Sequence, residues 1–219
     1  HILGLRKLDG IDEDPGAADY GNLIHDALDQ FIARHPEHLP PDGEHELLII
    51  GREVFKPLAA RPGLWAFWWP RFERIAKWFI QTEAARRDAI VKSYTEQAGT
   101  LDTSSGFQVY ARADRIDQLR DGGVAIIDYK TGAPPSQGDV ANGFAPQLPL
   151  EAAIAEKGGF GDVPAGPPAS MAFWKLSGGD PAGEIVEINT GRMKTTPAEL
   201  AHAAVDGVNG LAAAFADPE

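Results

Sequence analysis

The chain has 219 residues, 43% of them hydrophobic, and we expect one domain over residues 1–219 with a sizeable core. It has no cysteine, which excludes disulfides and cysteine-ligated zinc or iron–sulfur clusters and fits a reducing compartment. The formal net charge of −12 argues against a protein that gathers nucleic acid by bulk electrostatics. No apolar run approaches the roughly 18 to 20 residues of a membrane span, and we expect neither a span nor a leader. The chain begins at His1, and we expect it to be excised from a longer protein.

Helices dominate the first part of the chain. After a loop over residues 1–20, a helix is predicted from about Asp19 to Arg34, because Ile24, Leu28 and Phe31 recur at helical spacing. Asp19 is a suitable N-cap for it. A short helix is predicted over 44–58 and a long one over 64–87. The aromatic side chains of the long helix indicate either core packing, which we favour, or base stacking along a nucleic-acid strand.

A β-hairpin follows a predicted strand at about 90–97 and a linker near 103–106. Its turn is Asp121-Gly122-Gly123, so Asp114 on one strand is expected opposite Asp128 on the other. Side chains alternate along a strand, which places Asp128 and Lys130 on one face and Tyr129 on the other. The preceding run, Val124–Ile127, is wholly apolar and predicts a strand covered on both faces. The charged groups are therefore expected at the end of a buried strand.

The remaining elements complete the predicted architecture. A loop over 133–138 leads to a helix over 146–157, then two strands at 169–176 and 184–189. Thr196 and Glu199 form a capping box that begins a final helix over about 197–215. Without the short helix over 44–58, the order is helix, helix, strand, hairpin, helix, strand, strand, helix. It predicts an α/β or α+β fold in which a small mixed β-sheet is flanked by helices, with a catalytic core over about 18–190.

Two carboxylates and an ammonium at a strand end suit metal-assisted phosphodiester hydrolysis. Carboxylate oxygens bind Mg²⁺ or Mn²⁺, the ion activates water, and an ammonium stabilises developing negative charge. The alternative is that Asp128 and Lys130 merely pair with each other or with Arg115, and the hairpin context favours the site.

Two further acidic residues lie near this hairpin. Asp117 is expected to face away from Asp114 and to pair with neighbouring arginines. Glu96, on the preceding strand, is a candidate for the edge of the site.

Four segments, in this order, resemble the motifs of the RecB-like PD-(D/E)XK nucleases. Within that superfamily the chain is most similar, over about residues 18–157, to the C-terminal nuclease domain of AddB-type recombination and repair proteins. The resemblance implies a restriction-endonuclease-like core. The segments are Gly21-Asn22-Leu23-Ile24-His25, Ala113-Asp114-Arg115-Ile116-Asp117, Ile127-Asp128-Tyr129-Lys130-Thr131-Gly132 and Gln147-Leu148-Pro149-Leu150.

The resemblance also implies roles for single residues and a cofactor, Mg²⁺ or Mn²⁺. A histidine in the site is unusual for magnesium and favours manganese. The metal ligands would be His25, Asp114, Asp128 and the main-chain carbonyl of Tyr129. The catalytic residues would be Asp114, Asp128, Lys130 and Gln147.

The biological setting implied by the resemblance is DNA end processing in recombinational double-strand break repair. The domain would act as an exonuclease on single-stranded DNA or unwound duplex ends, beside a helicase/nuclease partner of AddA type, in the bacterial cytoplasm. Two features depart from the family pattern: Glu151 stands where a tyrosine is frequent, and an iron–sulfur cluster found in many relatives is not expected without cysteines.

Two other functions stay open. The chain could be a nuclease-inactive DNA-binding or scaffolding module of a helicase–nuclease complex, or a metal-dependent hydrolase of another phosphate ester. The intact set of Asp114, Asp128 and Lys130 favours the nuclease.

Overall fold

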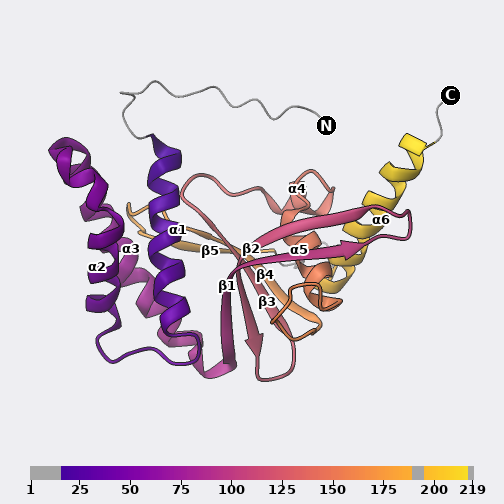
Figure 1. Cartoon of the computed structure of the whole chain (residues 1–219), viewed down its shortest axis with the longest axis horizontal. Coiled ribbons are helices and arrows are strands. Elements are labelled where there is room, and N and C mark those ends of the chain that lie inside the picture. Colours follow the sequence, from indigo (N-terminus) through magenta and orange to yellow (C-terminus); the bar gives the residue numbers. More distant parts are fainter. Residues whose placement is uncertain (1–15, 189–194, 217–219) are drawn as a thin grey trace.

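A five-stranded mixed sheet lies between two groups of helices in the computed structural model, which describes residues 16–188 and 195–216 (Figure 1). The strand order is β1-β2-β3-β4-β5, and neighbours are antiparallel except for the parallel pair β3 and β4. This arrangement confirms the predicted mixed sheet flanked by helices. The strands are β1 (Ile90–Asp102), β2 (Gln108–Leu119), β3 (Val124–Lys130), β4 (Pro168–Lys175) and β5 (Glu184–Glu187).

Three helices from the first part of the chain cover one face of the sheet. Their apolar side chains pack on Ile127, Tyr129 and Trp174. The predicted N-cap is wrong: Gly16 precedes the first helix, and the Asp19 carboxylate inside it accepts a hydrogen bond from Gly16 N–H at 2.7 Å. The elements are α1 (Ala17–Arg34), α2 (Gly43–Val54) and α3 (Pro62–Arg86), with short 3₁₀ turns at Lys56–Ala60 and Arg87–Ala89.

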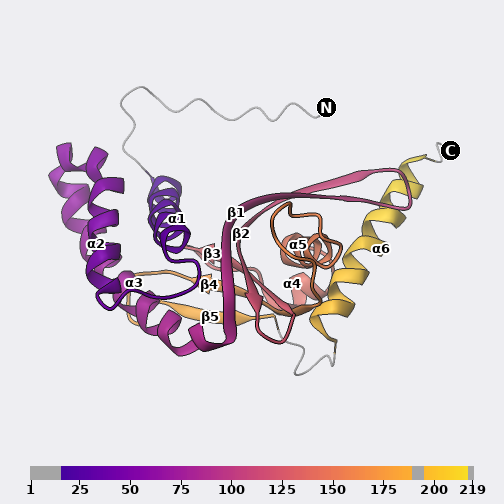
Figure 2. The ribbon, with the colours of Figure 1, turned by 60° about the horizontal axis from the view of Figure 1, so that its bottom comes forward.

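The opposite face carries α4 (Gln137–Ala141), α5 (Gln147–Glu156) and α6 (Pro197–Ala216) (Figure 2). Helices α4 and α5 form the crossover that joins the parallel strands β3 and β4. The loop predicted over 133–138 is wrong at its end, because α4 begins at Gln137 with Ser136 as its cap. The capping box of α6 is confirmed: Glu199 N–H donates to Thr196 Oγ1 at 3.2 Å, and Thr196 N–H donates to Glu199 Oε2 at 2.6 Å.

Some predictions fall outside the described residues, namely residues 1–15 of the loop predicted over 1–20 and the last residue of the strand predicted to end at Asn189. The end of that loop is wrong, because α1 already begins at Ala17. Within the described ranges, none of the helices combines the length and the apolar character needed to cross a bilayer.

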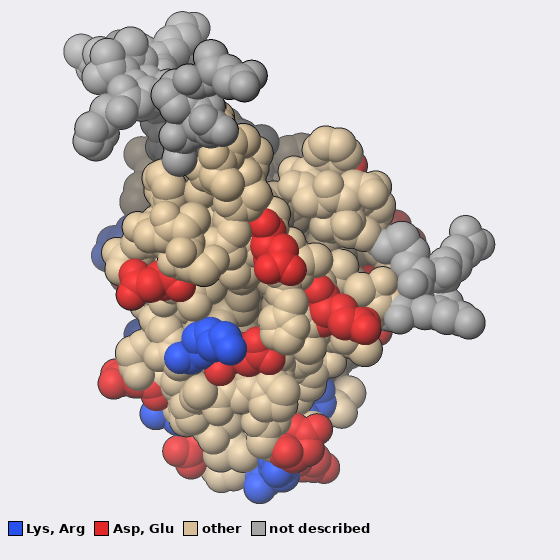
Figure 3. Space-filling view, turned by 90° about the vertical axis from the view of Figure 1, so that its right-hand side faces the viewer, with Lys and Arg blue, Asp and Glu red and all other residues tan. Residues whose placement is uncertain are grey.

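Charged side chains are scattered on the side of the molecule that carries α6. Figure 3 shows separate acidic and basic groups there, with large uncharged areas between them. The part of this face that the structure describes therefore has no continuous basic band. A nucleic-acid strand would find no extended cationic track along it.

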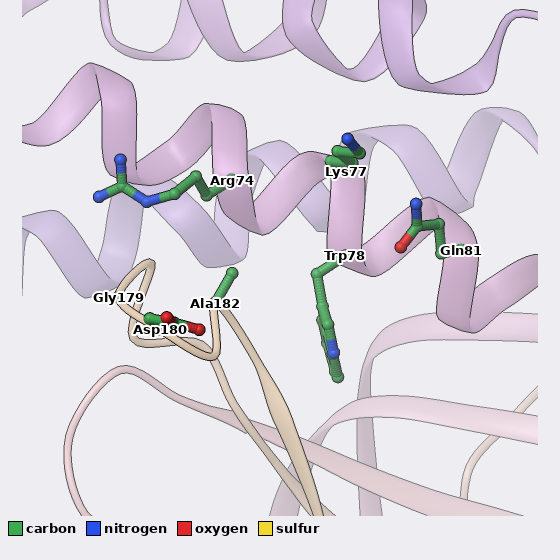
Figure 4. A pocket seen from close by; sticks show the side chains of 7 residues that line it. All are labelled: Arg74, Lys77, Trp78, Gln81, Gly179, Asp180 and Ala182. Atoms are coloured by element: carbon green, nitrogen blue, oxygen red, sulfur yellow. The ribbon is translucent and has the colours of Figure 1, made fainter.

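The aromatic side chains of α3 belong mainly to the core. Trp68, Trp69, Phe72 and Phe79 are buried, which confirms the core-packing interpretation for them. Trp78 is only partly buried and lines a surface hollow of about 660 Å³ between α3 and the turn that joins β4 to β5 (Figure 4).

A buried ion network joins α3 to β2. Arg115 is fully buried and binds Glu83 with both terminal nitrogens, at 2.7 and 2.9 Å, while its Nε donates to Asp117 Oδ1 at 2.7 Å. Arg86 also pairs with Asp117. Burial alone would raise the pKa of Asp117, but the charges of Arg115 and Arg86 lower it below its usual value. The prediction that Asp117 pairs with arginines is confirmed.

Candidate active site

The β2–β3 hairpin brings two carboxylates to the same place. The paired residues farthest from the turn are Arg115 and Ile127. The next residues on the two strands are Asp114 and Asp128, which agrees with the predicted register. Tyr129 N–H donates a hydrogen bond to Asp114 Oδ2 at 2.9 Å. The Asp114 side chain is thereby held against the strand that carries Asp128.

Asp128 is buried and is held from two sides. Lys130 Nζ donates to Asp128 Oδ1 at 2.9 Å and lies 2.7 Å from Oδ2, although Oδ2 accepts no well-aligned hydrogen bond from the part of the chain that the structure describes. Gln147, the first residue of α5, donates from Nε2 to Oδ1 at 2.7 Å. Burial raises the pKa of Asp128, and the Asp114 charge raises it further, while Lys130 lowers it.

His25 and Glu96 approach Asp114 from two other elements. His25 Nδ1, on α1, lies 3.5 Å from Asp114 Oδ2, and the register of β1 places Glu96 opposite Asp114. One ligand atom from each of the three residues lies within 4.8 Å of those of the other two. Burial raises the pKa of Glu96, and the Arg112 guanidinium 2.6 Å away opposes that rise. The structure thus places His25 and Asp114 together with Glu96, and Asp128 beside Lys130 and Gln147.

The main-chain carbonyl of Tyr129 points toward β2. On the β4 side, the carbonyl of the next residue, Lys130, accepts a hydrogen bond from Leu176 N–H at 2.7 Å. Successive main-chain carbonyls of a strand point alternately to its two neighbouring strands. The Tyr129 carbonyl therefore points to β2, the strand that carries Asp114. The Tyr129 side chain packs on the face away from α5, as predicted, where burial raises its pKa.

A glycine lets α1 pass close to the end of β3. A methyl group on Gly21 would lie 3.1 Å from Thr131 Oγ1, which is tighter than an ordinary van der Waals contact. His25 follows Gly21 by about one helical turn on α1. The close approach therefore places the His25 side chain over the strand end.

The chemistry of these groups fits a hard divalent cation. Mg²⁺ and Mn²⁺ prefer oxygen ligands, and Asp114, Asp128, Glu96 and the Tyr129 carbonyl supply them, with one imidazole from His25. Among the described residues, the buried Oδ2 of Asp128 is paired with the Lys130 ammonium but accepts no aligned hydrogen bond, so it keeps a lone pair that a ligand could use. From the sequence, Glu96 was a candidate only for the edge of the site. The pairing of β1 with β2, in which Glu96 lies across from Asp114, is the feature that could have identified it as a neighbour of Asp114.

Carboxylates at a strand end with a lysine two residues on are the arrangement expected of a metal-dependent phosphodiesterase. Consistent with this class, a family model described as the PD-(D/E)XK nuclease superfamily matches residues 1–219. The chain belongs to this superfamily, whose members are nucleases that use divalent metals. The five-stranded mixed sheet with helices on both faces is consistent with a restriction-endonuclease-like fold.

Relatives come from several species of Rickettsia and are described only as uncharacterized proteins. The chain is 30% identical over 162 residues to one from Rickettsia bellii, 30% over 166 residues to one from Rickettsia conorii, and 28% over 166 residues to one from Rickettsia typhi. Each match covers 73% of this chain and 19 to 20% of the relative. The chain thus spans about a fifth of the length of these curated relatives.

Proposed function

We propose that the chain is a divalent-metal-dependent deoxyribonuclease domain of the AddB type, which hydrolyses phosphodiester bonds at DNA ends. The observation that carries the proposal is the convergence of Asp114, Asp128 and Lys130 at the open end of the β2–β3 hairpin. Membership of the nuclease superfamily supports it. The position of His25 over the same strand end supports the RecB-like branch.

In this proposal, some residues of the site bind the metal ion and another stabilises negative charge on the phosphate. Asp114, Asp128, His25 and the Tyr129 carbonyl are the groups that would hold Mg²⁺ or Mn²⁺. Such an ion, when bound, polarises a phosphate oxygen and makes water more acidic. Lys130 carries a cation beside Asp128, where it orients a water molecule and stabilises negative charge on the phosphate.

The wider setting of the proposal is DNA end processing in double-strand break repair. The domain would act as an exonuclease on single-stranded DNA or unwound duplex ends, with an AddA-type helicase/nuclease partner, in the bacterial cytoplasm. The length of the relatives, about five times the matched part, leaves room for the segments that deliver DNA to this domain. A domain with a net charge of −12 needs such help, because it repels a phosphate backbone at long range.

Cleavage of end-labelled single-stranded oligonucleotides tests the proposal. We expect products with Mg²⁺ or Mn²⁺ and none with EDTA, and a loss of at least about 10²-fold in rate for Lys130→Ala or Asp128→Ala. Lys175→Ala is the matched control, because Lys175 lies beside Lys130 in the β3–β4 register and pairs with Glu184. Wild-type rates in both active-site variants would contradict the proposal.

The same protein samples distinguish the nuclease from the alternative function, a nuclease-inactive DNA-binding module. Fluorescence anisotropy that reports DNA binding, without any metal-dependent product, would favour that module. Hydrolysis of mononucleotide esters but not of oligonucleotides would instead indicate a phosphoesterase of small substrates.

A further inference from the structure

Glu151 is a buried acid beside the active site. It lies on α5, one turn after Gln147, and only 1% of it is exposed. Its Oε1 accepts a hydrogen bond from Gln147 Nε2 at 3.1 Å, and its Oε2 has no hydrogen-bond partner among the described residues. A buried carboxyl oxygen without a partner costs free energy that an apolar side chain at this position would not. Packing alone therefore does not account for an acid here.

The hydrogen bonds of Gln147 give Glu151 a role. A primary amide has two N–H donors on one nitrogen, and that nitrogen contacts Asp128 Oδ1 at 2.7 Å as well as Glu151 Oε1. Both donors are thus used, and the amide nitrogen is directed toward the two acids. Rotation of the amide by 180° would place its oxygen against the Asp128 carboxylate, which is electrostatically unfavourable.

We propose that Glu151 is a positioning residue of the active site, whose carboxyl oxygen fixes the Gln147 amide so that Gln147 holds Asp128 in place beside Lys130. The kinetic part of this inference rests on the proposed nuclease function. Glu151 occupies the position at which RecB-like nucleases frequently carry a tyrosine, and here the acid meets the glutamine within its own helix.

The protonation of Glu151 agrees with this arrangement. Burial raises its pKa to about 8; the hydrogen bond from Gln147 opposes the rise, and the charges of Asp128 and Asp114 add to it. Below that pH the group is a neutral acid that still offers a carbonyl acceptor. A glutamine at position 151 keeps such an acceptor without the acid, whereas a leucine has none.

Steady-state kinetics on an oligonucleotide test the inference with Glu151→Gln and Glu151→Leu. Glu156→Gln is the control, since Glu156 lies on the same helix but pairs with His202. We expect Glu151→Gln and the control to keep kcat within about twofold. Glu151→Leu should lower kcat about tenfold with KM unchanged, the equivalent of one hydrogen bond.

A double-mutant cycle tests whether Glu151 acts through Gln147. In a Gln147→Ala background, Glu151→Leu should change kcat less than twofold, because the side chain that it positions is already gone. The inference is overturned if Glu151→Leu retains wild-type kcat, or if it costs the same tenfold in both backgrounds. It is equally overturned if Glu151→Gln is as impaired as Glu151→Leu.

Nuclear magnetic resonance of the metal-free chain tests the positioning without any catalytic assay. The two side-chain N–H signals of Gln147, assigned by their loss in Gln147→Ala, should keep their positions in Glu151→Gln and shift or broaden in Glu151→Leu. Unchanged signals in Glu151→Leu would overturn the inference. A chain that shows the expected signals but no cleavage would refute the proposed function and leave the positioning intact.

Discussion

Three acids near the end of β3 sit in three different surroundings. Asp114 is 17% exposed and accepts a main-chain N–H, Asp128 is buried against a lysine, and Glu151 is buried against an amide. Burial raises the pKa of Asp128 and Glu151, and the Lys130 charge opposes the rise at both, but Lys130 donates a hydrogen bond to Asp128 and Gln147 donates the one to Glu151. The environment thus separates a carboxylate suited to a metal ion from an acid suited to hold a side chain.

The unfolding free energy of the metal-free chain should depend on Glu151 and pH. Its pKa is about 8 in the folded protein against an ordinary value of 4.5, so its contribution to stability is complete below pH 4.5 and is lost as the pH rises through 8. Relative to Glu151→Gln, the wild type should lose on the order of a few kcal/mol between pH 5 and 9. Urea denaturation in EDTA at pH 5, 7 and 9 measures this difference. Parallel profiles for the two proteins would show that Glu151 does not titrate in this way.

At the scale of elements, α3 is anchored to the sheet by charge as well as by its apolar face. Glu83→Gln removes the carboxylate that Arg115 binds with two nitrogens and leaves a buried cation partly uncompensated. We expect the free energy of unfolding to fall by about 3 to 5 kcal/mol in urea denaturation. The control is Glu53→Gln, whose pair with Lys56 is highly exposed at both ends and should change stability by less than ~1 kcal/mol. Equal stability of the two variants would argue against the buried network as an anchor.

Two glycines within helices should respond to alanine in opposite directions. A methyl group on Gly51 of α2 would lie 2.1 Å from a ring carbon of Phe72 on α3, so Gly51→Ala should destabilise the fold by about 1 to 3 kcal/mol. No described residue lies within 4 Å of a methyl group on Gly207 of α6, and Gly207→Ala should stabilise the fold by about 0.4 to 1 kcal/mol. Thermal denaturation of both variants checks the pair, and a stabilised Gly51→Ala would mean that α2 and α3 do not pack this closely.

The sequence predicted those parts of the fold that depend on local rules. The turn residues and the two-residue alternation of side chains along a strand were sufficient to place Asp114 opposite Asp128. The helical spacing of apolar residues was sufficient to locate α1 and α3. The five-residue α4 is too short to show a helical period, so it was missed. The proximity of Glu96 to Asp114 could not be predicted from local sequence patterns. It depends on the register between β1 and β2 and on a φ of +52° at Glu96, a value that few residues with a side chain adopt.

At the scale of the whole molecule, the net charge of the chain and the length of its relatives both indicate that the chain alone binds DNA weakly. The chain carries a net charge of −12 and spans about a fifth of the relatives that it matches. Its own contribution to DNA affinity is therefore expected to be small, with the rest supplied by other parts of a longer protein or by a partner.

The isolated chain should bind a single-stranded oligonucleotide weakly. At physiological salt we expect a Kd weaker than about 1 μM, and a shallow dependence on salt because few cations contact phosphates. Fluorescence anisotropy in EDTA between low and high salt measures both quantities, with Lys130→Ala as a sample that cannot cleave. Nanomolar binding with a steep salt dependence would show that the domain has a cationic track of its own.

The charge pattern of strand β2 also disfavours a shifted register of the hairpin. Asp114 and Ile116 alternate along it with Arg115 and Asp117, which lie against α3. A misregistered hairpin, shifted by one residue, would exchange the two sets. A slip in one direction would bring Arg115 to the place of Asp114, and a slip in the other direction would bring Asp114 to the place of Arg115, against the acidic Glu83. The first slip would replace a carboxylate by a cation at the strand end that carries Lys130, and the second would bury two carboxylates together. Each mispaired form is therefore expected to be less stable than the observed pairing, so Asp114 contributes to the register of the hairpin as well as to the candidate site.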